Sequence, residues 1–325
     1  MNDTHSVSTV NKVIGEDVAP IKPKKRRKPI NKEEISGTLY ASIPLLGFLI
    51  FGVIPLCMAF AMAFLKMSGF GFQGAKPAGW DNFKYVLTDE LFWESIVNTC
   101  VLGSSTFICQ ILALLVAYLL SKDIRGRKAF RMIYFIPYVC SGVAIVLMWK
   151  YIFNPHFGIL NQMLGRTGDN IINWLNDSRY YSWVVIFISV WSGMGYPIVL
   201  YTAALTNVNR STVEAATIDG AGPFRVFWNV VFPAISPTSF FLLVTGVIGA
   251  LQSFATSNVL SSGTTNANGP NNDGLTIVFY LYRKIFDYDG QMGYASASSW
   301  ILSLIILGVT IINFVGSKKW VSYDQ

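Results

Sequence analysis

The chain has 325 residues, of which 52% are hydrophobic and only 13% are charged, and its mean hydropathy is +0.44. A soluble domain needs more charge than this to cover its surface, so the composition excludes a soluble domain and indicates a membrane protein. The net charge of +7 would suit a nucleic-acid-binding protein, but residues 1–38 contain no aromatic residue, which argues against a nucleic-acid-binding arm.

The first segment, residues 1–38, is polar and basic. It offers too little apolar surface to form a core, so we expect a disordered tail there. The Lys and Arg residues of this tail precede an apolar run of full membrane length, without the short apolar region and small-residue cleavage site of a secretory signal peptide. We therefore interpret the basic segment as a topology signal that is not cleaved.

Six apolar runs follow along the chain, each long enough to cross about 30 Å of hydrocarbon as a helix. None of them contains Asp, Glu, Lys, Arg or His. They predict an all-α fold, a polytopic transmembrane helix bundle of about six spans over residues 39–318, with residues 319–325 as a short cytoplasmic tail. The runs cover approximately residues 40–65, 95–120, 132–149, 182–205, 235–259 and 292–315.

The basic residues outside the runs indicate the orientation. If the first segment is cytoplasmic, about 17 of the 25 Lys and Arg residues fall on the inner side, as the positive-inside rule expects. This predicts a multi-pass protein of a bacterial-type plasma membrane with both termini in the cytoplasm. On the outer side, residues 275–286 place apolar side chains at the spacing of a short amphipathic helix, which we expect at the membrane surface.

The chain lacks the groups that would supply energy or bind a metal. A carrier driven by ions usually holds ionisable residues within the membrane, and the six runs have none. The P-loop pattern G-x-x-x-x-G-K-[ST] is also missing, which argues against an intrinsic ATPase of that type. No C-x-x-C pair or His/Cys cluster occurs, so we expect no metal site and no cofactor bound by this chain.

The most informative segment is the loop between the fourth and fifth runs, residues 206–234. Ser211 and Glu214 have the spacing of a capping box at the start of a helix. Gly220 suits a helix end in the left-handed conformation, and Pro223 suits the first turn of a second helix. The pattern predicts a helix, a tight turn and a second helix on the cytoplasmic face, with little side-chain bulk at the turn. Such a unit could dock into a groove on another protein.

This loop resembles the EAA loop of ABC importer permeases. The match consists of Glu214-Ala215-Ala216, then Gly220 in the E-A-A-x-x-x-G spacing, and Pro233 at the end. The family usually has Leu-Pro where this chain has Phe232-Pro233, and the change remains apolar. The resemblance implies a coupling helix that inserts into a separate ATPase subunit, whereas the alternative is that Glu214 only caps a helix. The coupling residues that it implies are Glu214, Ala215, Ala216, Asp219, Gly220, Ala221 and Pro233.

Further segments resemble the carbohydrate-uptake group of these permeases, of the maltose type, and in particular the first of the two paired permeases. The matches run in order from about residue 38 to residue 320. They include Trp80-Asp81-Asn82-Phe83, Phe153-Asn154-Pro155 with Gly158 and Asn161, Gly269-Pro270 and Gly293-Tyr294-Ala295-Ser296-Ala297.

The resemblance also implies the partners. These are a second homologous permease, two copies of a P-loop ATPase that uses ATP and Mg, an extracellular sugar-binding protein and the lipid bilayer. No nucleic acid is among them. The chain itself is not expected to be an enzyme or to contain a catalytic residue, because the chemical step belongs to the ATPase.

A path for sugar needs aromatic faces and neutral hydrogen-bonding groups. The fourth run offers Trp191, Gly193 and Tyr196, and the fifth offers Gln252 and Ser253. Positions that look similar to Gly193, Tyr196 and Ser253 line the sugar path of the maltose importer, so the resemblance implies that role here. The alternative is that Trp191 and Tyr196 serve packing or anchor the helices at the membrane interface.

We therefore expect the membrane-spanning permease subunit of an ABC importer that moves a sugar, an oligosaccharide in particular, into the cytoplasm. The alternatives are an ABC permease for another solute such as glycerol-phosphate or a peptide, a self-sufficient secondary sugar carrier, and a membrane scaffold. A secondary carrier would predict intramembrane ionisable residues or repeated spans. A scaffold would not need the helix, turn and helix of the inner loop.

Overall fold

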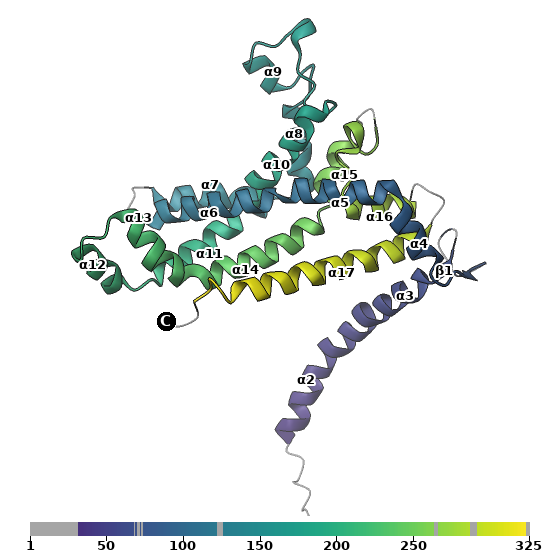
Figure 1. Cartoon of the computed structure of the whole chain (residues 1–325), viewed down its shortest axis with the longest axis horizontal. Coiled ribbons are helices and arrows are strands. Elements are labelled where there is room, and N and C mark those ends of the chain that lie inside the picture. Colours follow the sequence, from purple (N-terminus) through teal and green to yellow (C-terminus); the bar gives the residue numbers. More distant parts are fainter. Residues whose placement is uncertain are drawn as a thin grey trace, which may run out of the picture. The chain divides into compact units, whose positions relative to one another are not determined.

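The computed structural model describes residues 32–67, 69, 72, 74–121, 126–262, 266–286 and 291–322. The chain divides into two compact units, Met1–Pro55 and Leu56–Gln325. Most of the predicted tail lies outside the described residues. The helices of both units are labelled in Figure 1.

The helix of the first unit begins earlier than the sequence predicted. α2 (Lys32–Phe48) starts within the segment expected to be a tail and continues through a π-helical turn, η1 (Leu49–Val53), into α3 (Ile54–Ala63).

The described helices confirm an all-α polytopic bundle. Four are long and apolar enough to cross a membrane alone, and two more spans arise if each of two bent helix pairs counts as one. The four are Leu39–Ala63, Glu90–Ser121, Pro223–Ser261 and Met292–Ser317. The bent pairs are Ala129–Val139 with Gly142–Ile152, at 99°, and Ser178–Gly193 with Gly195–Thr206, at 46°.

Local chemistry explains the two bends. Pro197 lies just after the smaller bend, and its ring cannot donate a hydrogen bond to the carbonyl of Gly193. At the larger bend, the backbone of Cys140 is extended, with φ −68° and ψ 156°, so the helical hydrogen-bond ladder stops there.

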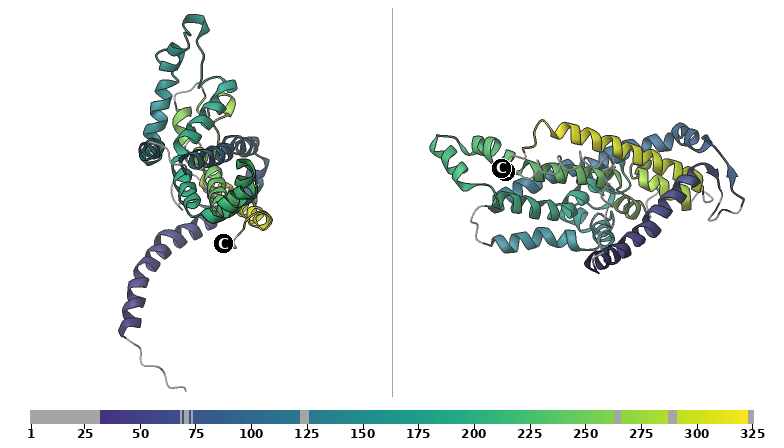
Figure 2. Two further views of the ribbon diagram at one scale, coloured as in Figure 1. Left: turned by 90° about the vertical axis from the view of Figure 1, so that its left-hand side faces the viewer. Right: turned by 90° about the horizontal axis from the view of Figure 1, so that it is seen from below.

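The second unit holds most of α3 and all the remaining elements. In chain order they are β1 (Leu65–Lys66), β2 (Lys76–Pro77), α4 (Asp81–Thr88), α5 (Glu90–Gly103), α6 (Ser105–Ser121), α7 (Arg127–Val139), α8 (Gly142–Ile152), α9 (Ile159–Met163), η2 (Gly168–Asn170), α10 (Ser178–Gly193), α11 (Gly195–Thr206), α12 (Arg210–Ile218), α13 (Pro223–Val226), η3 (Phe227–Val231), α14 (Phe232–Leu251), α15 (Ala255–Ser261), η4 (Pro270–Asn272), α16 (Ile277–Phe286) and α17 (Met292–Ser317). β1 and β2 pair antiparallel. Figures 1 and 2 show α6, α11, α14 and α17 running lengthwise, with β1 and α4 at one end and α12 and α13 at the other.

Small and neutral polar residues join the central helices. A Cβ atom at Gly246 of α14 would lie 2.6 Å from the Thr106 side chain of α6, so the two helices approach this closely only because that position is glycine. Gln110 of α6 donates through Nε2 to the Leu242 carbonyl of α14 at 3.0 Å. Its Oε1 accepts from the Tyr201 hydroxyl of α11 at 3.1 Å. One amide therefore connects three helices without a charge.

Two asparagines from the segments that suggested the family hold backbone carbonyls. Asn161 donates to the carbonyls of Pro155 and Ile172, at 3.1 and 3.0 Å, and accepts from Trp174 Nε1 at 3.1 Å. Asn82 donates to the last carbonyl of α3 at 2.8 Å and to the first carbonyl of β1 at 2.9 Å. Both side chains thus satisfy backbone groups that would otherwise be buried without a partner.

A buried ion pair fastens α16 to the start of α5. Lys284 Nζ lies 2.9 Å from Asp89 Oδ2, and the two side chains are 7% and 13% exposed. Asp89 also accepts from the Tyr280 hydroxyl at 2.8 Å, and Lys284 donates to the Tyr85 hydroxyl at 3.3 Å. α16 itself is the helix predicted over residues 275–286.

Hydrogen bonds determine the direction in which the pKa values of Asp89 and Lys284 are shifted. Burial by itself would raise the pKa of the Asp89 carboxyl, but the bonds from Lys284 and Tyr280 outweigh it and hold the pKa below its ordinary value of 3.8. Burial would likewise lower the pKa of Lys284, but the bonds to Asp89 and Tyr85 hold it above its ordinary value of 10.5. The pair therefore stays ionised at neutral pH.

Candidate functional site

The loop between α11 and α14 folds as the predicted helix, turn and helix. The predicted capping box of Ser211 and Glu214 is wrong, because Asn209 caps α12. Asn209 Oδ1 accepts from the Ser211 backbone N–H at 3.0 Å and from its hydroxyl at 2.8 Å. Asn caps a helix as well as Ser does, and the earlier start lengthens the helix.

The turn after α12 is closed by its own backbone. Gly220 N donates to the Thr217 carbonyl at 3.1 Å, and Ala221 N donates to the Ala216 carbonyl at 3.0 Å, the pattern of a Schellman motif. Gly220 has φ +82°, in the left-handed region that favours glycine. Gly222 then has extended backbone, and a proline occupies the first turn of α13. The predicted roles of glycine and proline as helix end and helix start are confirmed.

The predicted coupling residues divide into exposed and half-buried sets. Ala216 and Ala221 are half-buried and line a hollow of about 220 Å³ beside α12 and α13. Pro233 is half-buried in the first turn of α14. The exposed residues are Glu214, Ala215, Asp219 and Gly220.

The same loop carries two large apolar side chains that the sequence analysis missed. Ile218 is 86% exposed and Phe224 is 77% exposed. Large apolar side chains exposed together beside a turn indicate a contact surface. Ile218 precedes the Gly220 turn and Phe224 follows it. A large apolar residue on each side of a predicted turn was a usable signal in the sequence.

The loop is continuous with a helix that reaches the middle of the bundle. Pro223–Ser261 passes through α13, the π-helical turn η3, α14 and α15. π-helical turns of this kind occur frequently at functional sites.

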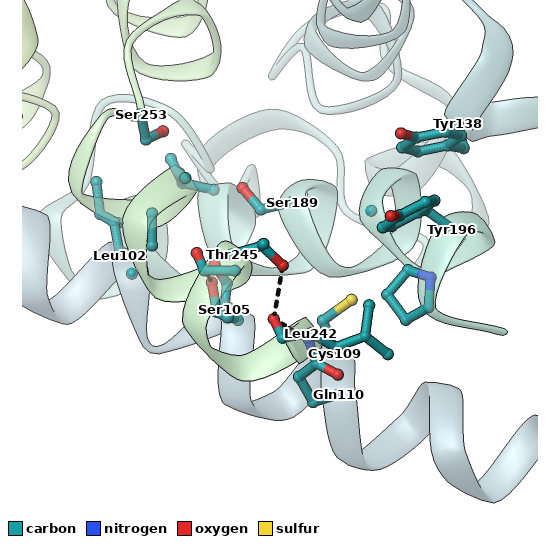
Figure 3. Close-up of a pocket in the computed structure, with 18 residues that line it drawn as sticks. Leu102, Ser105, Cys109, Gln110, Tyr138, Ser189, Tyr196, Leu242, Thr245 and Ser253 are labelled. Atoms are coloured by element: carbon teal, nitrogen blue, oxygen red, sulfur yellow. Dashed lines mark hydrogen bonds between the residues drawn. The ribbon is translucent and has the colours of Figure 1, made fainter. Parts of the chain in front are cut away.

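A cavity of about 480 Å³ lies in the second unit among α5, α6, α7, α10, α11 and α14 (Figure 3). The rings of Tyr138 and Tyr196 stack at one end of it, with centroids 5.7 Å apart and planes 19° from parallel. Ser253 lies toward the other end. No charged side chain is among the described residues that line the cavity.

The cavity brings together three of the five predicted path residues. Gly193, Tyr196 and Ser253 line it. Trp191 does not, and it packs edge-on against Trp149 with ring centroids 5.4 Å apart. Positions two residues apart on an α-helix are about 200° apart around its axis, so Trp191 and Gly193 lie on opposite faces of α10. Gln252 ends α14 as an exposed residue and does not line the cavity either.

Polar residues from other helices complete the lining, and sequence reasoning missed them. Gln110 is a long amide within the predicted span 95–120, and polar residues inside a membrane span often mark a transport path, so it was a usable signal. The missed polar residues are Ser105, Thr106, Gln110, Tyr138, Ser189 and Thr245. Among the residues that the structure describes, no group of three or more His, Cys, Asp or Glu is placed to hold a metal ion.

Residues 110–319 match the family described as binding-protein-dependent transport system inner membrane component. The chain belongs to this permease family. It is the membrane permease subunit of an ABC importer, which confirms the prediction made from the loop. Its relatives are transport subunits rather than enzymes.

The permease is similar to known proteins over most of its length. It is 33% identical to the "Probable ABC transporter permease protein YesP" of Bacillus subtilis over 306 residues, covering 93% of this chain and 96% of the relative. It is 32% identical to the sn-glycerol-3-phosphate transport system permease protein UgpA of Pectobacterium atrosepticum over 285 residues, covering 86% and 93%. A chain of a bacterial ABC transporter involved in the import of the acidic polysaccharide alginate has the same fold, with TM-score 0.75, 23% identity, and coverage of 89% and 97%.

Proposed function

We propose that this permease moves a carbohydrate, an oligosaccharide in particular, into the cytoplasm as one half of a pair with a second, similar permease. An extracellular sugar-binding protein delivers the substrate, and two copies of a P-loop ATPase hydrolyse ATP with Mg. Both termini and the α12–α13 loop face the cytoplasm, which the distribution of Lys and Arg supports. A related alginate transporter was solved with a pentasaccharide-bound periplasmic protein, which supports a binding-protein partner.

The lining of the cavity carries the carbohydrate proposal. A sugar offers weakly apolar ring faces that stack on aromatic rings, as Tyr138 and Tyr196 provide, and hydroxyls that bond neutral groups such as Gln110 and Ser189. The name of the relative UgpA states sn-glycerol-3-phosphate as its substrate, and a phosphate is usually bound by Arg or Lys. The described lining residues include neither, so the cavity favours a carbohydrate.

We further propose that residues 206–234 form the contact with the ATPase. Ile218 and Phe224 would supply the apolar centre of this contact, and Glu214 and Asp219 its polar rim. Closure of the ATPase pair would displace α12 and α13 and, through η3, the cavity-lining helix α14. The ATPase performs the chemical step, and the permease converts its motion into a change of access.

Uptake by the reconstituted assembly tests this function. The permease, its second permease, the ATPase and the binding protein are combined in proteoliposomes with ATP on the ATPase side. We expect ATP-dependent uptake of a neutral oligosaccharide and no uptake of sn-glycerol-3-phosphate. Uptake by the single chain without ATP would contradict the importer and support a secondary carrier. Uptake of sn-glycerol-3-phosphate alone would contradict only the carbohydrate assignment.

A bulky side chain in the cavity should block transport. Gly249 lines the cavity, and a Cβ atom there would meet nothing within 4 Å, so Gly249→Phe adds a ring without a backbone clash. We expect initial uptake to fall at least about tenfold, which corresponds to about 1.4 kcal/mol in the barrier. The assembled complex should be recovered in normal yield, measured by co-purification of the ATPase.

Gly308→Phe is the matched control for this experiment. Gly308 lies in α17, a Cβ atom there also meets nothing within 4 Å, and it does not line the cavity. This variant should transport normally. An equal loss in both variants would show that a large ring in any span is harmful, and would argue against the cavity as the path.

A further inference from the structure

After α17 the chain turns back onto the first turns of α14. The Ser317 carbonyl accepts from the Trp320 backbone N–H at 3.1 Å, which closes a turn. Ser322 then donates its backbone N–H to the Ser236 hydroxyl at 2.9 Å. The described part of the segment predicted to be a tail, residues 319–322, is therefore packed against the bundle.

Trp320 lies on the joint between η3 and α14. Its ring stacks on Phe232, with centroids 6.3 Å apart and planes 18° from parallel, and meets Phe240 edge-on at 6.2 Å. Phe232 is the first residue of α14, directly after the π-helical turn. Both ring arrangements are attractive ones for aromatic side chains.

A second set of rings connects the same joint to the exposed loop. Phe232 contacts Trp228 of η3, with ring centroids 5.0 Å apart, and Trp228 contacts Phe224 at 6.1 Å. Phe224 is the exposed aromatic residue of the loop. Ring contacts therefore lead from the proposed ATPase surface, along η3, to Trp320.

We propose that Trp320 is a positioning residue for coupling, which braces the joint between η3 and α14. A π-helical turn interrupts the regular hydrogen-bond ladder and is a place where a helix bends. Bending there would absorb a displacement of the loop before it reached Thr245 and the rest of the cavity. With Trp320 packed on Phe232 and Ser322 bonded to Ser236, the joint moves as one piece. The inference rests on the proposed function of the loop.

The brace has to be distinguished from simple anchoring. A tryptophan beside the end of a span often only anchors the helix at the membrane interface. Anchoring depends on the amphipathic indole with its N–H, whereas the brace depends on ring contacts with Phe232 and Phe240. Trp320→Phe keeps an aromatic ring and removes the indole N–H, so it separates the two roles.

The deciding measurement is the number of ATP molecules hydrolysed per substrate molecule taken up by the reconstituted complex. For Trp320→Ala we expect this ratio to rise at least about fivefold while basal ATP hydrolysis is retained. Hydrogen exchange over residues 227–231 should become faster in the same variant. Trp320→Phe should stay within about twofold of the unaltered protein. Ser236→Ala, which removes the acceptor for Ser322, should raise the ratio by less.

Trp183→Ala is the matched control, because Trp183 is 68% exposed and belongs to α10. An unchanged ratio in Trp320→Ala would overturn the brace, as would an equal rise in Trp183→Ala or in Trp320→Phe. If Trp320→Ala does not assemble, an unchanged ratio in Ser236→Ala overturns it instead. ATP hydrolysis without any uptake by the unaltered complex would refute the proposed function itself, which is a different result.

Discussion

Replacing Gly220 with valine should reduce ATP-driven uptake at least about tenfold, equivalent to about 1.4 kcal/mol, although the permease still reaches the membrane. Gly220 has φ +82°, where a β-branched residue carries a strain of about 1–3 kcal/mol. Relief of that strain would open the turn that places Ile218 and Phe224 on either side of it, so the loop would no longer fit its partner. Uptake and the amount of ATPase that co-purifies are the measurements.

Gly222→Val separates backbone strain from side-chain bulk. Gly222 has φ −68° and ψ 163°, and a Cβ atom at either glycine would meet nothing within 4 Å. Valine at position 222 should therefore be tolerated. Gly220→Asn should lose less uptake than valine, because Asn enters the left-handed region more readily. Normal uptake by Gly220→Val would refute the docking role of the turn, and an equal loss in Gly222→Val would assign the effect to bulk.

Lys284→Met should lower the free energy of unfolding by about 3–5 kcal/mol, because it leaves a buried carboxylate without its cation. The Asp89 side chain is only 13% exposed, so water cannot replace the lost ammonium. The thermal midpoint of the detergent-solubilised permease is the measurement. Asp89→Asn combined with Lys284→Met should recover most of the loss, because no charge is then buried and an amide oxygen can still accept from the Leu91 backbone N–H that Asp89 caps.

Arg179→Met is the control for removing a cation from an ion pair. Arg179 lies 2.7 Å from Asp177, but its side chain is 80% exposed, so we expect no detectable shift of the midpoint. A midpoint for Lys284→Met that equals that of Arg179→Met would contradict the importance of the buried pair.

The buried pair also predicts how its contribution depends on pH. The folded pKa of Asp89 lies below 3.8, so its contribution is present above that pH and is lost as the pH falls through the folded pKa. The folded pKa of Lys284 lies above 10.5, so its contribution is present below that pH and is lost as the pH rises through the folded pKa. The midpoint difference between the unaltered protein and the double variant, in which neither group titrates, should therefore be constant between about pH 5 and 9.

The loop of residues 206–234 shows which local features the sequence could predict. The turn at Gly220 and the helix start at Pro223 depend on the backbone preferences of single residues, so both were predictable. The start of α12 was not, because Asn209 and Ser211 are both good caps and the choice depends on which one ends the longer helix. Exposure of Ile218 and Phe224 was also not predictable, because it depends on whether another segment covers them.

The all-α fold, the apolar character of the spans and the likeness to ABC importer permeases could be read from the amino-acid sequence, because the length of an apolar run and the spacing of a short motif are local properties. The sequence could not show which side chains line the same cavity. Gly193 and Trp191 are two residues apart, yet only Gly193 lines the cavity, because the pairing of α10 with its neighbours decides which face turns inward. The contact of Trp320 with Phe232 likewise arises only when α17 packs along α14, since residues so far apart in the chain meet through packing alone.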